Sequence, residues 1–125
     1  MRLGIIGLPN SGKTTIFNAL TRSKLPTGAA TSGLFEVHTA VVSVPDTRVD
    51  RLKAMYTPKK TTYTQVTYVD IGGLDKGIGD GGLKGQFRNE LAQLDGFLHV
   101  VRTFEDPNVP HPYDTNDAAR DVEAL

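Results

Sequence analysis

The chain has 125 residues and a mass of 13.5 kDa, which is enough for one hydrophobic core and too little for two ordinary domains. Fourteen basic residues balance fourteen acidic ones, so bulk charge does not attract the chain to nucleic acid or to a membrane, and the lack of cysteine excludes disulfides and thiolate metal sites. No apolar run approaches the roughly 20 residues that cross a bilayer, and the N-terminus lacks a signal-peptide pattern, so we expect a cytoplasmic protein without membrane contact.

The first half of the chain predicts two strands and two helices. An apolar run stopped by glycine predicts a buried parallel strand at residues 2–7, and an apolar stripe with helical spacing predicts a helix at about residues 13–21. Residues 22–33 have no apolar period, so a loop is expected there. Near-alternating β-branched residues predict a strand over residues 35–44, and Asp46 is placed to cap a short helix after it.

The second half continues the alternation of strands and helices. Residues 61–70 predict a third strand, followed by a glycine-rich segment at residues 72–85 that is expected to be a mobile loop. A helix is predicted over residues 83–94 and a fully buried strand over residues 96–101. After an irregular segment with three prolines at residues 103–113, Asp114 is a candidate cap for a last helix that runs to the chain end. This order predicts an α/β sheet with helices on its faces. Because no strand follows the last helix, we expect the chain to be one piece of a longer protein.

The strongest motif is the sequence Gly-Leu-Pro-Asn-Ser-Gly-Lys-Thr at residues 7–14, which matches G-x-x-x-x-G-K-[ST] in full. It follows a predicted strand and opens a predicted helix, so that backbone N–H groups and the helix N-terminus can surround a phosphate chain. Glycine is expected at Gly7 and Gly12 because a Cβ would block that approach. Lys13 would supply a positive charge to the β- and γ-phosphate oxygens, and Thr14 a hydroxyl to Mg²⁺. The motif predicts a P-loop nucleoside triphosphatase.

A second motif, Val-Asp-Ile-Gly-Gly, lies at residues 69–73. Asp70 ends a predicted buried strand and would hold Mg²⁺ through a water, while the Gly73 N–H would contact the γ-phosphate. Alone, this segment is also typical of an Asp-Gly turn. Combined with the first motif, it predicts the second half of the same site.

These segments together resemble the YchF subfamily of the Obg-like ATPases and GTPases, in the translation-factor class. The resemblance is carried by GLPNSGKTTIFNALT, VVSVPDTRVDRL, PKK, VDIGGLDKG, GFLHVVRTFED and ARDVEAL, which cover most of the chain in the family's order. It implies a Ras-like G domain: a three-layer α/β sandwich whose mostly parallel sheet has one antiparallel strand, here truncated at the C-terminus. It also implies a metal site at Thr14 and Asp70 and a phosphate-binding stretch made of Asn10, Ser11, Gly12, Lys13, Thr14 and Thr15.

The same resemblance implies a function. Members of the subfamily hydrolyse ATP, often in preference to GTP, and associate with ribosomes, so we expect a conformational switch that uses ATP or GTP with Mg²⁺. An Asn-x-x-Glu motif replaces the guanine-reading Asn-Lys-x-Asp in that subfamily. Neither motif occurs in this sequence. Its place is expected beyond Leu125, together with a helical insertion and a small β-rich TGS domain.

Two positions differ from the pattern of small GTPases. Leu74 stands where many of them have the glutamine that positions the attacking water, and a leucine side chain makes no hydrogen bonds. The subfamily shares this replacement, which implies slow intrinsic hydrolysis. In the first switch loop, relatives place a Mg²⁺-binding threonine where a gap-free count gives Leu34. Thr31 is our candidate for this third metal position, and Ser32 is also close.

Other polar residues leave alternatives open. His38, His99 and His111 show no metal-ligand spacing, and Lys59 with Lys60 fits a solvated turn or a surface facing a ribosomal partner. Arg102 has acidic neighbours in the sequence, Glu105 and Asp106, and is expected either in local ion pairs or in a link to the switch loop.

Three functions remain possible from the sequence. The first is a nucleotide-dependent switch that binds and hydrolyses a purine nucleoside triphosphate. The second is a nucleotide kinase or metabolic ATP enzyme, which would need an arginine-rich lid and an acceptor site that the sequence does not display. The third is a non-catalytic nucleotide-binding or ribosome-interaction module, which the residues Leu74 and Leu34 leave open.

Overall fold

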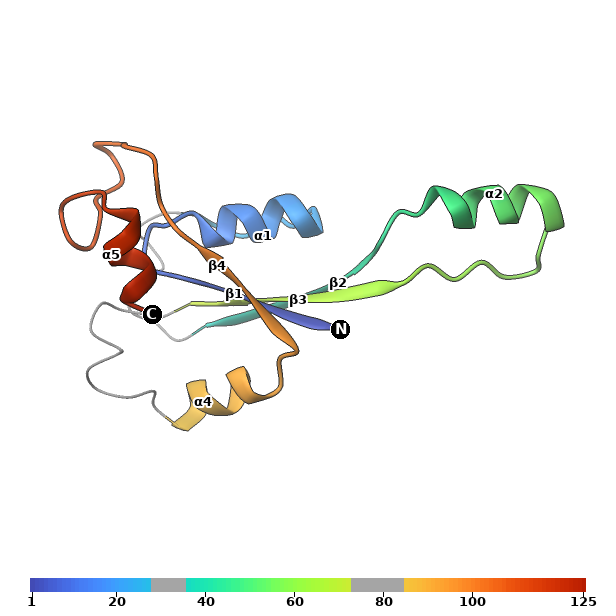
Figure 1. The fold of residues 1–125 in the computed structure, drawn as a ribbon, viewed down its shortest axis with the longest axis horizontal. Coiled ribbons are helices and arrows are strands. Elements are labelled where there is room, and N and C mark those ends of the chain that lie inside the picture. The colour runs from blue at the N-terminus through green and yellow to red at the C-terminus, as the bar shows by residue number, and fades with distance from the viewer. Residues whose placement is uncertain (28–35, 73–84) are drawn as a thin grey trace.

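The computed structural model describes residues 1–27, 36–72 and 85–125, and these residues build a four-stranded sheet (Figure 1). The strands lie in the order β2-β3-β1-β4 and are β1 (Arg2–Gly7), β2 (Val37–Ser43), β3 (Gln65–Ile71) and β4 (Gly96–Val100). Strand β1 is parallel to both of its neighbours, β3 and β4, whereas β2 is antiparallel to β3. The predicted α/β fold with a mostly parallel sheet and one antiparallel strand is therefore confirmed.

Helices cover both faces of this sheet. Helix α1 (Lys13–Thr21) follows β1, and α4 (Gly85–Ala92) precedes β4; Figure 1 shows α1 above the sheet and α4 below it. A short last helix, α5 (Ala118–Glu123), lies at the end of the sheet where β1 runs into α1. Helix α2 (Thr47–Tyr56) projects from the opposite end. The sheet is thus the middle of three layers.

The core forms on both faces of β3. Val69 and Ile71 are fully buried and pack with Phe87 of α4. Because side chains alternate along a strand, Asp70 between them points to the opposite face, which α1 covers. Phe17 of α1 is fully buried on that face. Burial of these apolar side chains holds the sheet against both helices. Each buried side chain contributes about 1.5–3 kcal/mol to the stability of the fold.

The register of the strands brings three chain segments to the same end of the sheet, where the parallel strands have their C-terminal residues. Ile5 of β1 lies beside Asp70 of β3, and Gly7 lies beside Val100 of β4. The three parallel strands therefore end together, so the loop after β1, the end of β3 and the segment after β4 meet at that end of the sheet. The candidate site is built there.

Two expectations about local structure are wrong. The strand at residues 96–101 was expected to be fully buried, yet Phe97 is 50% exposed, because in the described part of the chain β4 pairs with β1 alone and forms an edge of the sheet. The last helix does not start at Asp114, whose φ of 64° is left-handed. Its cap is Asp117, three residues later, whose carboxylate accepts a hydrogen bond from the Arg120 N–H, and the helix begins at Ala118.

The third strand begins at Gln65, four residues later than the alternating pattern indicates. The short helix after β2 is confirmed, and Asp46 caps it by accepting a 2.9 Å hydrogen bond from the Arg48 N–H. Within the described ranges, no helix combines the length and the apolar character needed to pass through a membrane.

Candidate functional site

The loop between β1 and α1 is tightly turned. The Ser11 N–H donates to the Leu8 carbonyl at 3.2 Å, and Asn10 and Gly12 both have positive φ angles, 60° and 95°. Only glycine takes the second of these conformations without strain, which explains Gly12. No side chain caps α1, and its first turn contains no acidic residue. The start of this helix therefore presents its partial positive charge without a counter-charge from its own sequence.

Gly7 is required for a different reason from the one the sequence suggests. A Cβ at this position would lie 2.6 Å from the Ser11 Oγ and 2.8 Å from the carbonyl oxygen of Val100. The close approach is thus between the loop and strand β4, inside the protein. Gly7 lets the loop fold back over the end of the sheet.

Lys13 is half-buried at the start of α1, and its side chain forms no hydrogen bond or ion pair with any described residue. Burial lowers the pKa of Lys13 below its ordinary value, and the negative charge of Asp70 raises it in part. A desolvated ammonium group without a partner gains free energy when an anion binds beside it.

Thr14 and Asp70 meet in front of this lysine. The Thr14 hydroxyl donates to the Asp70 Oδ2 at 2.9 Å, and Asp70 is only 2% exposed. The second carboxylate oxygen, Oδ1, is buried and has no hydrogen-bond partner among the residues described. A hydroxyl and a carboxylate with a free oxygen are the hard oxygen donors that Mg²⁺ takes, so these two residues fit the metal.

The fit to Mg²⁺ has a clear limit. In residues 1–27, 36–72 and 85–125, no three His, Asp or Glu side chains gather at one point. An octahedral Mg²⁺ at Thr14 and Asp70 would therefore depend on water and ligand phosphate for its remaining oxygens, which is how this ion binds in phosphate-transferring proteins.

The structure brings most of the sequence-predicted site residues together. The stretch from Asn10 to Thr15 forms the loop and the first turn of α1, and Asp70 faces it from β3. The remaining predicted residues lie outside the described parts of the chain: Gly73, Thr31, Ser32, Leu34 and Leu74.

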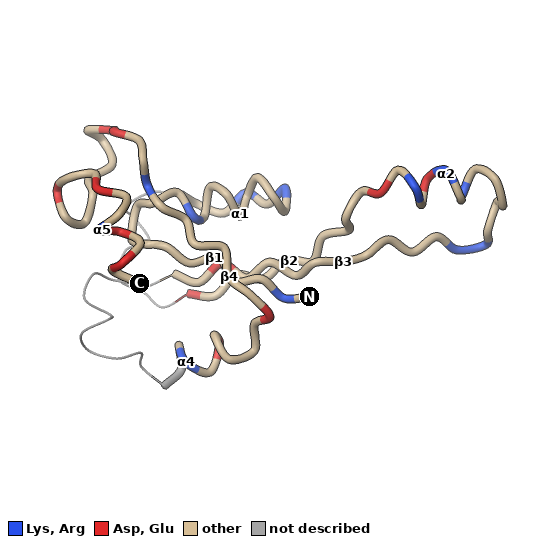
Figure 2. Tube along the Cα trace, viewed as in Figure 1, with Lys and Arg blue, Asp and Glu red and all other residues tan. Residues whose placement is uncertain are grey.

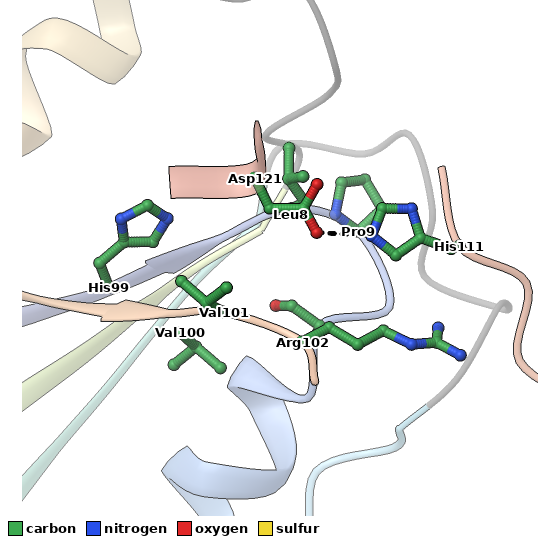
Figure 3. Close-up of a pocket in the computed structure, with 9 residues that line it drawn as sticks. Leu8, Pro9, His99, Val100, Val101, Arg102, His111 and Asp121 are labelled. Carbon is green, nitrogen blue, oxygen red and sulfur yellow. Dashed lines mark hydrogen bonds and ion pairs between the residues drawn. The ribbon is translucent and has the colours of Figure 1, made fainter. Parts of the chain in front are cut away.

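A small pocket lies on the other side of the loop (Figure 3). The loop itself, the end of β4, the following segment and α5 all contribute to it, through Leu8, Pro9, Ser11, His99, Val100, Val101, Arg102, His111 and Asp121. Figure 3 shows His111 and Asp121 joined beside Leu8 and Pro9. The loop therefore packs against the end of β4, the following segment and α5.

Arg102 ties the loop to the segment after β4. This side chain is 4% exposed and donates to three backbone carbonyls: to Asn10 at 3.3 Å, to Phe104 at 3.1 Å and to Val109 at 2.7 Å. Of the two alternatives, the local ion pairs are not found, because Arg102 forms none with the described residues; the link that the structure shows is to the loop between β1 and α1. The Asn10 side chain adds a second link between the same two segments by donating to the Pro110 carbonyl at 3.0 Å.

His111 and Asp121 form a buried pair that the sequence did not reveal. The His111 Nε2 lies 2.7 Å from the Asp121 Oδ2, and both side chains are 5% exposed or less. Because His111 Nδ1 accepts the Tyr113 N–H at 3.0 Å, the ring proton lies on Nε2 and is donated to Asp121. Arg120 donates to the other carboxylate oxygen at 2.9 Å. The pair fixes the segment after β4 to α5.

This pair predicts how stability depends on pH. Burial alone raises the pKa of Asp121, but the hydrogen bonds from His111 and Arg120 outweigh it, so that the pKa lies below its ordinary value. A lowered carboxylate pKa stabilises the fold above the unfolded-state pKa of about 4, and this contribution is lost as the pH falls further. We expect urea unfolding at a series of pH values to show a steeper loss of stability below pH ~4 in the wild type than in Asp121→Asn. Parallel curves would contradict the assignment.

The comparisons with known proteins agree with this geometry. The protein-family model described as "50S ribosome-binding GTPase" matches residues 2–124. The protein named "Ribosome-binding ATPase YchF" of Mycoplasma genitalium is 39% identical over 123 residues, which are 98% of this chain and 34% of that protein. Its namesake in Escherichia coli O157:H7 is 39% identical over 125 residues, and "Obg-like ATPase 1" of Oryza sativa subsp. indica is 38% identical over 126. The chain spans about a third of the length of these relatives.

Proposed function

We propose that this chain, which belongs to the family of 50S ribosome-binding GTPases, binds a purine nucleoside triphosphate with Mg²⁺ and hydrolyses it slowly as a conformational switch. The resemblance to the YchF and Obg-like ATPases is confirmed, since proteins with those names are 38–39% identical to nearly the whole chain. Because the chain spans a third of their length, we infer that residues 1–125 are the N-terminal part of a G domain. Further strands, a helical insertion and a TGS domain would follow in the complete protein.

The observation that carries this proposal is the half-buried ammonium group of Lys13, which has no partner among the described residues and lies beside the Thr14–Asp70 pair. It lies at an uncapped helix start, next to a loop held in a tight turn. A chain of phosphates would satisfy each of these features at once: its negative charge would pair with Lys13 and face the N-terminus of α1.

In this proposal the residues have distinct roles. The stretch from Asn10 to Thr15 surrounds the phosphates, and Lys13 stabilises the charge that develops on the transferred phosphoryl group. Thr14 and Asp70 hold Mg²⁺, which neutralises charge between the phosphates when it is bound. Gly73 remains our candidate for the N–H that contacts the γ-phosphate, and Thr31 for the third metal position. The base would be read by residues outside this chain, since no base-reading motif occurs in it.

The partner is also a proposal. Two of the relatives carry the words "ribosome-binding" in their names, and the matching family model carries them in its description. We propose that the complete protein associates with the ribosome and that nucleotide binding changes this association. The segments that would respond are those next to the γ-phosphate in our assignment, as in other nucleotide switches.

Single-turnover hydrolysis of ATP and GTP by the complete protein, with and without Mg²⁺, tests this function. We expect slow turnover that requires Mg²⁺. Asp70→Asn keeps the shape of the side chain but removes its charge, so we expect it to weaken the apparent affinity for Mg²⁺ by about ten- to a hundredfold. Asp114→Asn is the matched control, because Asp114 is exposed and asparagine tolerates its left-handed backbone. Nucleotide binding without any turnover would favour the non-catalytic module instead.

A further inference from the structure

The segment between β2 and β3 leaves the body of the protein. We call residues 44–64 the arm: it contains α2 and returns to the sheet where the Val44 N–H donates to the Thr64 carbonyl at 2.7 Å. Figure 1 shows α2 at the far end of the molecule, opposite the end where β1 runs into α1. Helix α2 contains no buried residue. Nothing in the described part of the chain therefore accounts for its apolar side chains.

One face of α2 mixes apolar and basic side chains. Arg48, Arg51, Leu52 and Met55 follow the spacing i, i+3, i+4, i+7 and so share one side of the helix. Leu52 is 54% exposed and Met55 72%. Asp50, on the other side, hydrogen-bonds to the Tyr63 hydroxyl of the returning segment. The face with both arginines is therefore turned away from the arm's own backbone.

Charge decides which kind of partner this face suits. The arm carries five basic residues and two acidic ones, in a chain whose net charge is zero, and all five basic residues are exposed. Of these five basic residues, only Arg48 forms an ion pair with a described residue, with Asp46 at 2.9 Å. Residues 102–125, at the opposite end of the molecule, contain six acidic and two basic residues (Figure 2). A large polyanion would therefore be attracted to the arm.

Within the class of polyanions, the side chains favour RNA. Arginine matches phosphate with a planar fork of donors, and the exposed Arg51 is free to use it. Tyr56, 71% exposed at the end of α2, offers an aromatic face on which a base can stack. Lys59 and Lys60 follow in the exposed turn. Alternation of basic with aromatic and apolar groups is typical of surfaces that contact both the backbone and the bases of RNA.

We propose that the arm is an RNA-binding surface, which contacts phosphates through Arg51, Lys59 and Lys60 and a base through Tyr56. That this RNA belongs to the ribosome rests on the proposed function; the binding itself does not. The arm and the phosphate loop lie at opposite ends of the sheet, so RNA and nucleotide occupy separate sites.

The test is fluorescence anisotropy of a labelled RNA hairpin titrated with the complete protein at several salt concentrations. The triple variant Arg51→Gln, Lys59→Gln, Lys60→Gln is expected to weaken binding at least about tenfold and to reduce the salt slope by about two to three. The matched control removes the same charge from exposed sites elsewhere: Arg22→Gln, Lys24→Gln, Arg88→Gln. This control is expected to bind RNA as the wild type does.

Three results would overturn the proposal: no binding by the wild type, an equal loss in both triple variants, or competition by polyglutamate as strong as by unlabelled RNA. The last result would indicate an acidic protein surface as the partner. Titration of the same proteins with Mg²⁺ and ATP or GTP separates the two proposals. Loss of RNA binding in the arm variant stands as support even if the wild type binds no nucleotide, in which case only the proposed function fails.

Discussion

Lys13→Ala is expected to weaken the binding of a Mg²⁺–nucleoside triphosphate by about a hundredfold, from the loss of roughly 3 kcal/mol of charge-assisted hydrogen bonding. The ammonium group is half-buried and unpaired in the described structure, and its pKa is lowered by burial, so most of its interaction free energy becomes available when phosphate binds. Isothermal titration calorimetry measures the affinity directly.

The fold should survive this substitution, because Lys13 makes no side-chain hydrogen bond or ion pair within residues 1–27, 36–72 and 85–125. Urea unfolding is expected to match the wild type. Lys24→Ala is the matched control: Lys24 is exposed beyond the far end of α1, and its removal should leave the affinity unchanged. Equal affinities of the Lys13 and Lys24 variants would show that the loop does not use its lysine to hold phosphate.

Arg102→Ala is expected to lower both stability and nucleotide affinity. It removes three hydrogen bonds and leaves the carbonyls of Asn10, Phe104 and Val109 without this donor, which we estimate to cost about 3 kcal/mol of unfolding free energy. Since one of those carbonyls belongs to the phosphate loop, the remaining folded molecules should also bind the triphosphate more weakly.

The conservative variant separates a positioning role from a purely structural one. Arg102→Lys keeps the charge but has no planar fork, so it should restore stability in part and affinity less. Arg88→Ala, at an exposed site of α4, is the control and should change neither. If Arg102→Ala lowers stability but the folded fraction binds nucleotide as tightly as the wild type, Arg102 does not position the loop.

The parts of the fold that the sequence predicts correctly are those whose causes are local. Strand β1 and helix α1 have the bounds expected from an apolar run followed by glycine and from a helical apolar stripe. Asp46 caps α2 as its position suggests. The closeness of Thr14 and Asp70 also follows, because Thr14 lies in the first turn of the helix after β1, Asp70 lies near the end of β3, and β1 and β3 are parallel neighbours.

The parts that failed depend on tertiary structure. An apolar run cannot reveal which strand lies at an edge, so the exposure of Phe97 could not be foreseen. Asp114 and Asp117 are equally good caps in sequence, and only the backbone angles distinguish them. The hydrogen bond from Arg102 to the Asn10 carbonyl joins residues that are 92 positions apart in the sequence. The one local signal that the Arg102 side chain is buried was its position directly after an apolar strand.

The buried pair His111 and Asp121 left even less trace in the sequence. The two residues are ten positions apart, one in an irregular segment and one in a short helix. In that helix the apolar Val122 is 51% exposed, while the charged Asp121 is 2% exposed. The polar pair is stable there because Arg120, His111 and the Tyr113 N–H satisfy its hydrogen bonds.

The central claim is that the stretch from Asn10 to Thr15 binds the phosphates and that other residues bind the base. Competition between a nucleotide and bare tripolyphosphate tests this claim most directly. In a calorimetric titration with Mg²⁺, the complete protein is expected to bind ATP or GTP saturably, and tripolyphosphate to displace it competitively in the wild type. Saturable nucleotide binding that tripolyphosphate does not affect, and that is equally tight in Lys13→Ala, would contradict the account.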